Sequence, residues 1–277
     1  MKPYPEAATV RRLLMHEANV HATPGRALRD LGDAILLTDP IDPDPFWNRV
    51  EAVRWPRAAD AFDRRLAEVA VLFATQGRQP HVWVSPPHDE PSDLAARLAA
   101  NGFEDVGDGL LMIASDDRQA QAAMRRGLPA GASLERLAGL RGTIAAQAAQ
   151  EIVPVLLTAF AVEPERGPGV VSETLASLAD ERFTHYVIRL DGAPVAVARR
   201  ATFDGLSYLS SIGTVERARG RGLGRFVTAA AMVDAIAAGS ELVHLGVFAD
   251  NEPAISLYEG LGFSMSGEPG PDMFLVG

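Results

Sequence analysis

Short apolar runs rich in β-forming residues alternate with longer stretches of helical spacing through the second half of the chain. The β-rich runs predict strands, and apolar residues three and four apart predict helices. Asp191-Gly192 marks a hairpin turn, and Pro154 is expected to bend the helix that contains it. The expected strands are 133–137, 183–190, 194–202, 206–214, 242–248, 263–266 and 273–276, the last two closing the sheet, and the expected helices are 143–161, 170–181, 225–238 and 254–261. This alternation favours a mixed α/β fold.

Glycines and arginines are concentrated between the strand 206–214 and the helix 225–238. Gly220, Gly222 and Gly224 free the backbone to take positive φ, so that consecutive N–H groups can point at one anion. The loop opens a helix, and the helix dipole adds to the attraction for negative charge. A pyrophosphate is therefore the expected ligand of this loop.

Two other kinds of phosphate loop fit the same segment poorly. A Walker loop needs a lysine after its last glycine, and Lys2 is the only lysine of the chain. A dinucleotide fingerprint needs a glycine where Arg225 stands and an acidic residue at the end of the next strand, whereas Glu241 lies before that strand.

A second motif begins about thirty residues after the glycine loop, at Asn251. Its apolar residues Ala254, Leu257, Tyr258 and Leu261 share one helical face, and Gly262-Phe263 follows. Spacing alone would also suit a core tyrosine at position 258. The order and distance of the two motifs resemble those of the GNAT family of acetyl-CoA-dependent N-acetyltransferases, whose pyrophosphate loop matches Arg219-x-x-Gly222-x-Gly224.

The resemblance implies that an acetyl group passes from acetyl-CoA directly to a primary amine of a small acceptor, in a ternary complex and without a metal. Backbone groups of one strand end would hold the cofactor arm and the thioester carbonyl, and Tyr258 would protonate the departing thiolate. Asn251 would contact the cofactor arm or brace the gap between strands. The strand end is Ile212, Gly213 and Thr214, and the pyrophosphate would be held by Arg219, Gly220, Arg221, Gly222, Leu223, Gly224 and Arg225.

The sequence does not identify the base that takes a proton from the amine. Many family members place a carboxylate on the fourth or fifth strand, where this chain has Tyr208, Ser210 and Ser211 on one strand and His244 on the other. His244, Glu151, Glu163 and Glu165 remain open as candidates. The missing carboxylate also leaves a second hypothesis, a non-catalytic acetyl-CoA-binding sensor or interaction module.

The first half of the chain contains a fainter copy of the same layout. Residues 77–84 and 93–103 repeat the arrangement of residues 239–263, but 55–60 contains no glycine and Leu98 stands in the place of Tyr258. The resemblance therefore implies two GNAT-like domains in tandem, each a mostly antiparallel sheet flanked by helices. We expect a degenerate domain at 1–125 and a working domain at 126–277, joined by the polar segment 115–131. The expected tandem arrangement also resembles that of the mycothiol synthases, although Tyr208 stands at the fourth-strand position where a carboxylate would be expected.

Composition narrows the function classes further. The chain has 277 residues, no cysteine and a net charge of −10, which excludes disulfides and thiolate chemistry and argues against a nucleic-acid partner. No apolar stretch reaches the roughly 20 residues of a membrane span, and the start at 1–6 lacks a signal-peptide core. We expect a cytoplasmic monomer or homodimer that acts without a membrane. His16 and His21 do not have zinc-helix spacing and are expected on a solvated helix face.

Overall fold

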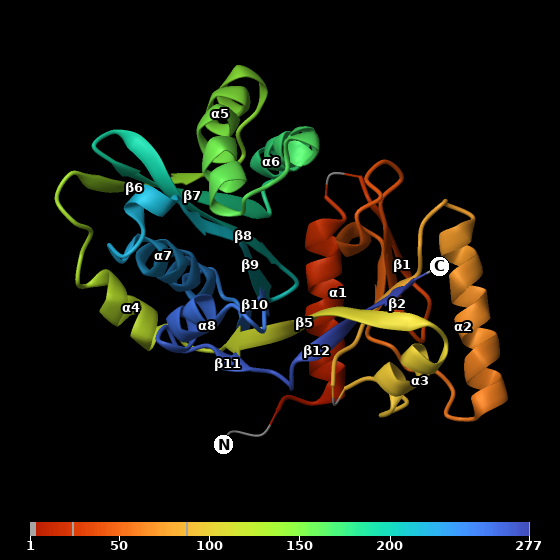
Figure 1. The fold of residues 1–277 in the computed structure, drawn as a ribbon. Helices are drawn as coiled ribbons and strands as arrows, with labels where there is room; N and C mark the ends of the chain where they lie inside the picture. Colours follow the sequence, from red (N-terminus) through yellow and green to blue (C-terminus); the bar gives the residue numbers. More distant parts are fainter. Residues whose placement is uncertain (1–3, 24, 87, 277) are drawn as a thin grey trace. The chain divides into compact units, whose positions relative to one another are not determined.

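The computed structural model describes residues 4–23, 25–86 and 88–276, so Met1–Pro3 of the expected start lie outside the described residues. The chain divides into two compact units. The first comprises Met1–Met112, Gly246–Glu252 and Met265–Gly277, and the second comprises Ile113–Leu245 and Pro253–Ser264. Each is built from a largely antiparallel sheet with flanking helices (Figure 1), which confirms the mixed α/β class.

The sheet of the second unit follows the predicted strands closely. Its strands pair in the order β10-β9-β8-β7-β6, antiparallel from β6 to β9 and parallel between β9 and β10. The predicted hairpin is confirmed, because Asp191 and Gly192 both have positive φ in the turn between β7 and β8. The bounds are β6 Ala132–Leu137, β7 Phe183–Leu190, β8 Ala193–Phe203, β9 Leu206–Thr214 and β10 Leu242–Phe248.

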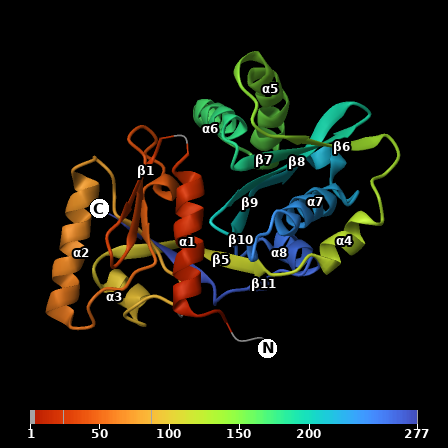
Figure 2. The ribbon, with the colours of Figure 1, turned by 180° about the vertical axis from the view of Figure 1, so that it is seen from behind.

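Helices cover both faces of this sheet (Figures 1 and 2). His185 contacts Ser177 of α6, whereas the next residue, Tyr186, donates to Asp234 of α7, so α6 and α7 lie on opposite faces. Pro154 lies inside α5, which continues to Ala159. The helices are α4 Arg118–Met124, α5 Gly142–Ala159, α6 Gly167–Ala179, α7 Leu223–Ala237 and α8 Glu252–Glu259, with short 3-10 turns at η2 Pro164–Arg166 and η3 Glu216–Ala218. Among the described residues, no helix is long and apolar enough to cross a membrane.

The first unit has strand order β1-β2-β3-β4-β12-β5. Strands β1 to β3 are antiparallel, and β3 pairs with β4 in parallel. Its elements are α1 Ala7–His21, β1 Ala27–Asp30, β2 Ile35–Thr38, η1 Pro45–Trp47, β3 Arg49–Glu51, α2 Ala59–Ala74, β4 His81–Trp83, α3 Leu94–Ala100, β5 Phe103–Ala114 and β12 Gly270–Leu275, while β11 Ser264–Met265 lies at the boundary of the units.

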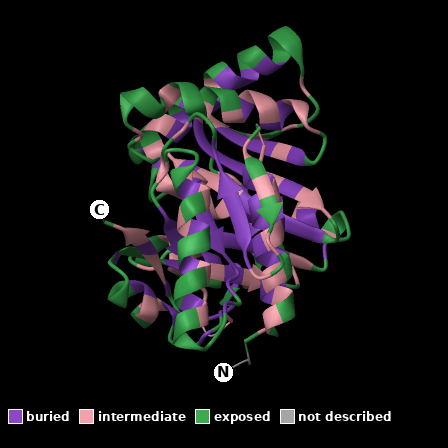
Figure 3. Cartoon of the chain, turned by 90° about the vertical axis from the view of Figure 1, so that its right-hand side faces the viewer, coloured by how far each residue is buried: buried purple, intermediate pink, exposed green. Residues whose placement is uncertain are grey.

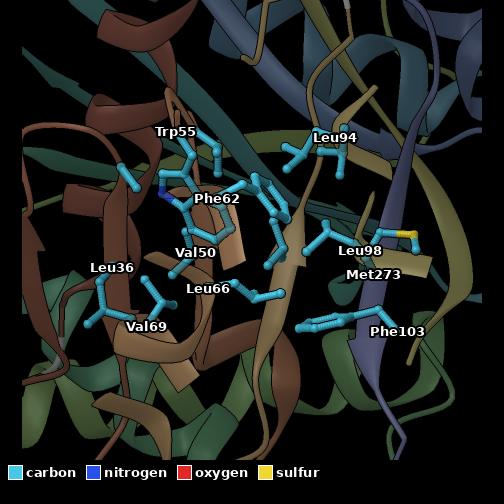
Figure 4. Close-up of a cluster of buried hydrophobic side chains, with 14 of the residues drawn as sticks. Leu36, Val50, Trp55, Phe62, Leu66, Val69, Leu94, Leu98, Phe103 and Met273 are labelled. Carbon is cyan, nitrogen blue, oxygen red and sulfur yellow. The ribbon is translucent and has the colours of Figure 1, made fainter. Parts of the chain in front are cut away.

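The core of the first unit gathers between its sheet and the helices α2 and α3 (Figure 4). The rings of Trp55 and Phe62 meet edge to face with centroids 5.7 Å apart. Leu98, which stands where the second half has Tyr258, is fully buried in this cluster. Figure 3 shows that buried residues gather along the strands and on the helix faces that cover them. Burying each large apolar side chain contributes about 1.5–3 kcal/mol.

Two expectations from the sequence are wrong. The last strand was expected to close the sheet of the second half, but Met273 of β12 is registered with Asp105 of β5 and Val82 of β4 in the first unit. An alternating pattern predicts a strand and its two faces, but it does not determine which neighbouring strand it pairs with. His16 and His21 are buried instead of solvated, with 3% and 4% of their surface exposed.

Candidate functional site

The end of β9 has a registered neighbour on one side only in the described part of the chain. Registered pairs between β9 and β10 stop at Tyr208 and His244, and in the described part of the chain the segment 209–214 is registered with β8 alone. The register with β8 shifts opposite Ser211, which has φ 52°. Such a bulge re-aims the backbone groups that follow it. The edge of β9 at Ile212 that faces away from β8 is thus left for another partner.

The glycine loop opens α7 as the sequence predicts. Gly220 and Gly222 each have φ 75°, and Gly222 is the N-cap residue of α7. The positive φ expected at Gly224 is wrong, because this residue lies within the helix. A Cβ at Gly224 would lie 3.2 Å from Thr214 Oγ1 and 3.7 Å from Leu257 Cδ1. A Cβ there would crowd the Thr214 hydroxyl, whereas its distance from Leu257 would be an ordinary van der Waals contact.

The three arginines of the loop have different partners. Arg219 donates from Nε to the carbonyl of Thr214 over 3.1 Å and from Nη2 to the carbonyl of Ala159 over 3.3 Å. Arg225 donates from Nη1 to the carbonyl of Gly260 over 2.9 Å. Arg221 is exposed and makes no hydrogen bond or ion pair with a described residue. Among these three arginines, its guanidinium is therefore the one that no acceptor in the described ranges engages.

The start of α7 fits an anion such as a pyrophosphate. Along α7, the first N–H group that donates to a loop carbonyl is that of Phe226. It donates to the carbonyl of Gly222 over 3.0 Å. The N–H groups of Leu223, Gly224 and Arg225 have no acceptor among the described residues. No atom lies within 4 Å of where a Cβ would stand at Gly220 or Gly222. Orphan N–H groups at an open helix N-terminus bind phosphates.

Tyr258 lies at the end of α8 with its ring 6.0 Å from that of Phe263, edge to face. Burial raises the pKa of Tyr258 to about 12, so the hydroxyl stays protonated at neutral pH. This hydroxyl forms no hydrogen bond with any of the described residues. The side chain therefore combines a packed ring with a hydroxyl proton that no acceptor in the described part of the chain engages.

The predicted site residues do not all belong to one unit. Asn251 lies in the segment Gly246–Glu252, which groups with the first unit, and its N–H donates to the carbonyl of Phe248 over 3.0 Å. All the others lie in the second unit, namely Ile212, Gly213, Thr214, Arg219, Gly220, Arg221, Gly222, Leu223, Gly224, Arg225 and Tyr258.

A polar row that the sequence did not reveal crosses the sheet on the face covered by α5 and α6. His185, Arg199 and Ser210 are registered directly opposite one another on β7, β8 and β9. Arg199 is 4% exposed, donates from Nε to Ser210 Oγ over 3.0 Å and pairs through Nη1 with Glu173 of α6 at 2.7 Å. Burial, aided by Arg199, lowers the pKa of His185 to about 3. The pair Arg199-Arg200 after the apolar run of β8 was the signal in the sequence.

The residues left open as bases occupy different surroundings. Glu151 of α5 pairs with Arg189 of β7. Glu163 and Glu165 lie at η2, where both are exposed. His244 is fully buried, with its ring 5.0 Å from that of Tyr208. No group of three or more His, Asp or Glu residues in the described ranges could hold a metal ion.

The match to a known protein family lies in the second half of the chain. Residues 151–263 match the model of the Acetyltransferase (GNAT) family. The mycothiol acetyltransferase of Actinosynnema mirum is 28% identical over 199 residues, which are 69% of this chain and 62% of that protein. The mycothiol acetyltransferase of Kineococcus radiotolerans is 36% identical over 109 residues, 38% of this chain and 36% of that protein. The chain thus spans less than two thirds of these relatives.

Solved structures with the same fold cover nearly the whole chain. A GCN5-related N-acetyltransferase from Kribbella flavida has a TM-score of 0.68 and 20% identity, covering 95% of each chain. A tandem GNAT protein from the clavulanic acid biosynthesis pathway has a TM-score of 0.62 and 18% identity, covering 93% of this chain and 86% of that one. At these identities the solved structures show the fold of the chain, and the match to the family model is confined to residues 151–263.

Proposed function

We propose that this GNAT-type acyltransferase transfers the acetyl group of acetyl-CoA to a primary amine of a small molecule, by direct attack in a ternary complex. One observation carries the proposal: the open N-terminus of α7 lies close to both the end of β9 and α8, since a Cβ at Gly224 would stand 3.2 Å from Thr214 Oγ1 and 3.7 Å from Leu257 Cδ1. The open start of α7, the bulged end of β9 and the buried Tyr258 of α8 therefore all belong to the second unit.

Each part of this site would have one task. The N–H groups of residues 223–225 and the guanidinium of Arg221 would hold the pyrophosphate. Backbone groups at 212–214 would hold the cofactor arm and polarise the thioester carbonyl. Acetyl-CoA supplies the activated acyl group and a thiolate leaving group. Tyr258, protonated because burial raises its pKa to about 12, would donate the proton that the thiolate needs.

We also propose that the chain consists of two GNAT-like domains in tandem, a degenerate one at 1–125 and a working one at 126–277. The order α1-β1-β2-β3-α2-β4-α3-β5 parallels α5-β7-β8-β9-α7-β10-α8-β11, with α6 added between α5 and β7. In both halves a parallel strand pair follows the antiparallel strands. Between β3 and α2 the buried Trp55 and the capping residue Ala58 replace the glycine loop, which would leave the first half without a cofactor site.

The acceptor can be sought among small amines. The relatives are named mycothiol acetyltransferases, so mycothiol lacking its acetyl group is the first acceptor to test, alongside glucosamine, L-cysteine and putrescine. We expect thiol release from acetyl-CoA that depends on one of these amines, together with an N-acetylated product identified by mass spectrometry.

The variant Tyr258→Phe separates catalysis from binding. It should lose transfer while still binding acetyl-CoA, because the ring and its contact with Phe263 are kept. A wild-type protein that binds acetyl-CoA and acetylates none of these amines would instead support the non-catalytic sensor.

A further inference from the structure

Phe160, the residue that follows the last turn of α5, places an aromatic ring beside the end of β9. A Cβ at Gly213 would stand 3.3 Å from Cε2 and 3.8 Å from Cζ of this ring. The residue is nevertheless 53% exposed. The tip of the ring therefore lies close to the backbone that would polarise the thioester carbonyl, while half of the residue stays accessible to a ligand.

The register of β8 with β9 shows on which face of the sheet the ring lies. A Cβ at Gly213 points to the same face as its registered partner Val197, and Arg199, two residues farther along β8, shares that face. Arg199 pairs with Glu173 of α6, and α7 lies on the opposite face. The open start of α7, which would hold the pyrophosphate, thus belongs to the other face. The face beside Phe160 is left for the acceptor.

Two sets of contacts hold the helix end that carries the ring. Ala161 has φ 48°, and beyond it the N–H of Val162 donates to the carbonyl of Leu157 over 3.0 Å, a closure typical of helix C-termini. Alanine at positive φ is strained, so the surrounding contacts must fix this turn. Arg219 adds a second tie, because it donates to backbone carbonyls at the ends of both α5 and β9. The backbone beneath the ring is thus fixed by the protein itself.

A single exposed apolar side chain is common on protein surfaces. The ring of Phe160 differs because it is held at the strand end where acyl transfer would take place. Sites for small molecules are lined mainly by apolar and aromatic side chains, and a flat ring packs well against a partner that is also flat. An amine carried on a ring offers such a face of C–H groups, whereas a linear amine offers only a narrow chain.

We propose, on the basis of the proposed acetyltransferase function, that Phe160 is a specificity-determining residue of the acceptor site and that the acceptor is a primary amine attached to a ring. The apolar face of the acceptor packs on the ring of Phe160, which brings the amine to the end of β9. Phe160 takes no part in the chemical step. It binds substrate and transition state alike, so its loss affects KM more than kcat.

Ile144→Ala is the matched control for Phe160→Ala, because Ile144 is also an exposed apolar residue of α5 and lies at the other end of the helix. Phe160→Tyr keeps the ring. KM and kcat would be measured with the best cyclic amine of the panel, such as glucosamine, and with putrescine, together with acetyl-CoA binding by calorimetry.

We expect Phe160→Ala to raise KM for the cyclic amine about five- to twentyfold, with kcat and acetyl-CoA affinity within about threefold of wild type. The KM for putrescine should change less, so the preference for the cyclic amine should narrow. Phe160→Tyr and Ile144→Ala should both stay within about twofold of wild type.

The outcomes distinguish this inference from the function on which it rests. An unchanged KM in Phe160→Ala, or a best acceptor that is linear, such as L-cysteine or putrescine, would overturn the inference and leave the acetyltransferase intact. A loss of acetyl-CoA affinity in Phe160→Ala would also overturn it, since the ring would then line the cofactor site. Absence of transfer by wild type to every amine of the panel would remove the proposed function and this role with it.

Discussion

Arg225 donates a hydrogen bond of 2.9 Å from Nη1 to the backbone carbonyl of Gly260, just beyond the end of the helix that carries Tyr258. A Cβ at position 260 would lie 2.5 Å from Arg225 Nη2, so the contact depends on glycine there. The arginine that the sequence assigned to the pyrophosphate thus uses its side chain to join α7 to the end of α8. Its N–H group still belongs to the open first turn of α7.

The variants Arg225→Met and Arg221→Met should separate a structural role, the bond from α7 to Gly260, from a role in binding acetyl-CoA. Loss of the bond to Gly260 should reduce the free energy of unfolding by about 1 kcal/mol, measured by urea denaturation. Arg221→Met should leave stability unchanged and weaken acetyl-CoA binding about two- to fivefold at low salt, with the difference shrinking as salt is added. The opposite assignment, a stability loss in Arg221→Met alone, would contradict this division.

Gly213→Ala tests the close approach of α5 to β9. Because the new Cβ would stand 2.8 Å from Ala159 Cβ, one of the two elements must shift, at a cost of about 1–3 kcal/mol in the free energy of unfolding. Ala159→Gly removes the opposing methyl group, so the double variant should be more stable than the sum of the single effects predicts. Strictly additive effects would show that the two positions do not meet.

Local patterns predicted most elements of the second unit. Asp191-Gly192 placed the hairpin because both turn residues need positive φ, and the glycine loop placed the start of α7. The partner of β12 was missed because the pairing of Met273 with Val82 and Asp105 joins segments far apart in the chain, and no local pattern specifies such a pairing.

The local conformation of the candidate site could be predicted from the sequence, but its long-range contacts could not. Gly220 and Gly222 could be predicted because their role lies in backbone conformation, which is local. The role of Gly224 depends on Thr214 and Leu257, and the pairing of Arg199 with Glu173 joins a strand to a helix 26 residues earlier in the chain. Such contacts arise only when the sheet and its helices are assembled.

The pH dependence of catalysis follows from the protonated state of Tyr258. Since burial raises the pKa of Tyr258 to about 12, this residue keeps its proton throughout the neutral and moderately alkaline range. The plot of kcat against pH should therefore show no decline due to Tyr258 between about pH 7 and 10. A fall near pH 9 in wild type that is absent from the residual activity of Tyr258→Phe would contradict the assignment.

The first unit should become less stable as pH rises from about 4 to about 7. Burial raises the pKa of Asp89 to about 7, although its Oδ2 accepts a 2.7 Å hydrogen bond from the N–H of Ser85. A carboxyl whose pKa is raised on folding contributes stability below its unfolded pKa and loses that contribution as pH rises through the folded pKa. Each tenfold difference in proton affinity between the folded and unfolded states corresponds to about 1.4 kcal/mol.

Asp89→Asn removes this titration and can still accept the bond from Ser85. The melting temperature of the variant relative to wild type should therefore rise between about pH 4 and pH 8. Taking the difference cancels the titration of distant groups, and a difference that is the same at both pH values would refute the role of Asp89.

The central claim is that the open start of α7 binds the pyrophosphate of acetyl-CoA, and calorimetric titration of Gly222→Glu tests it most directly. Gly239→Glu is the matched control, because Gly239, just past the other end of α7, also has positive φ and open space around a Cβ. We predict one acetyl-CoA site per chain in wild type and Gly239→Glu, and none in a folded Gly222→Glu. Equal binding by both variants, or no binding by wild type, would contradict the account.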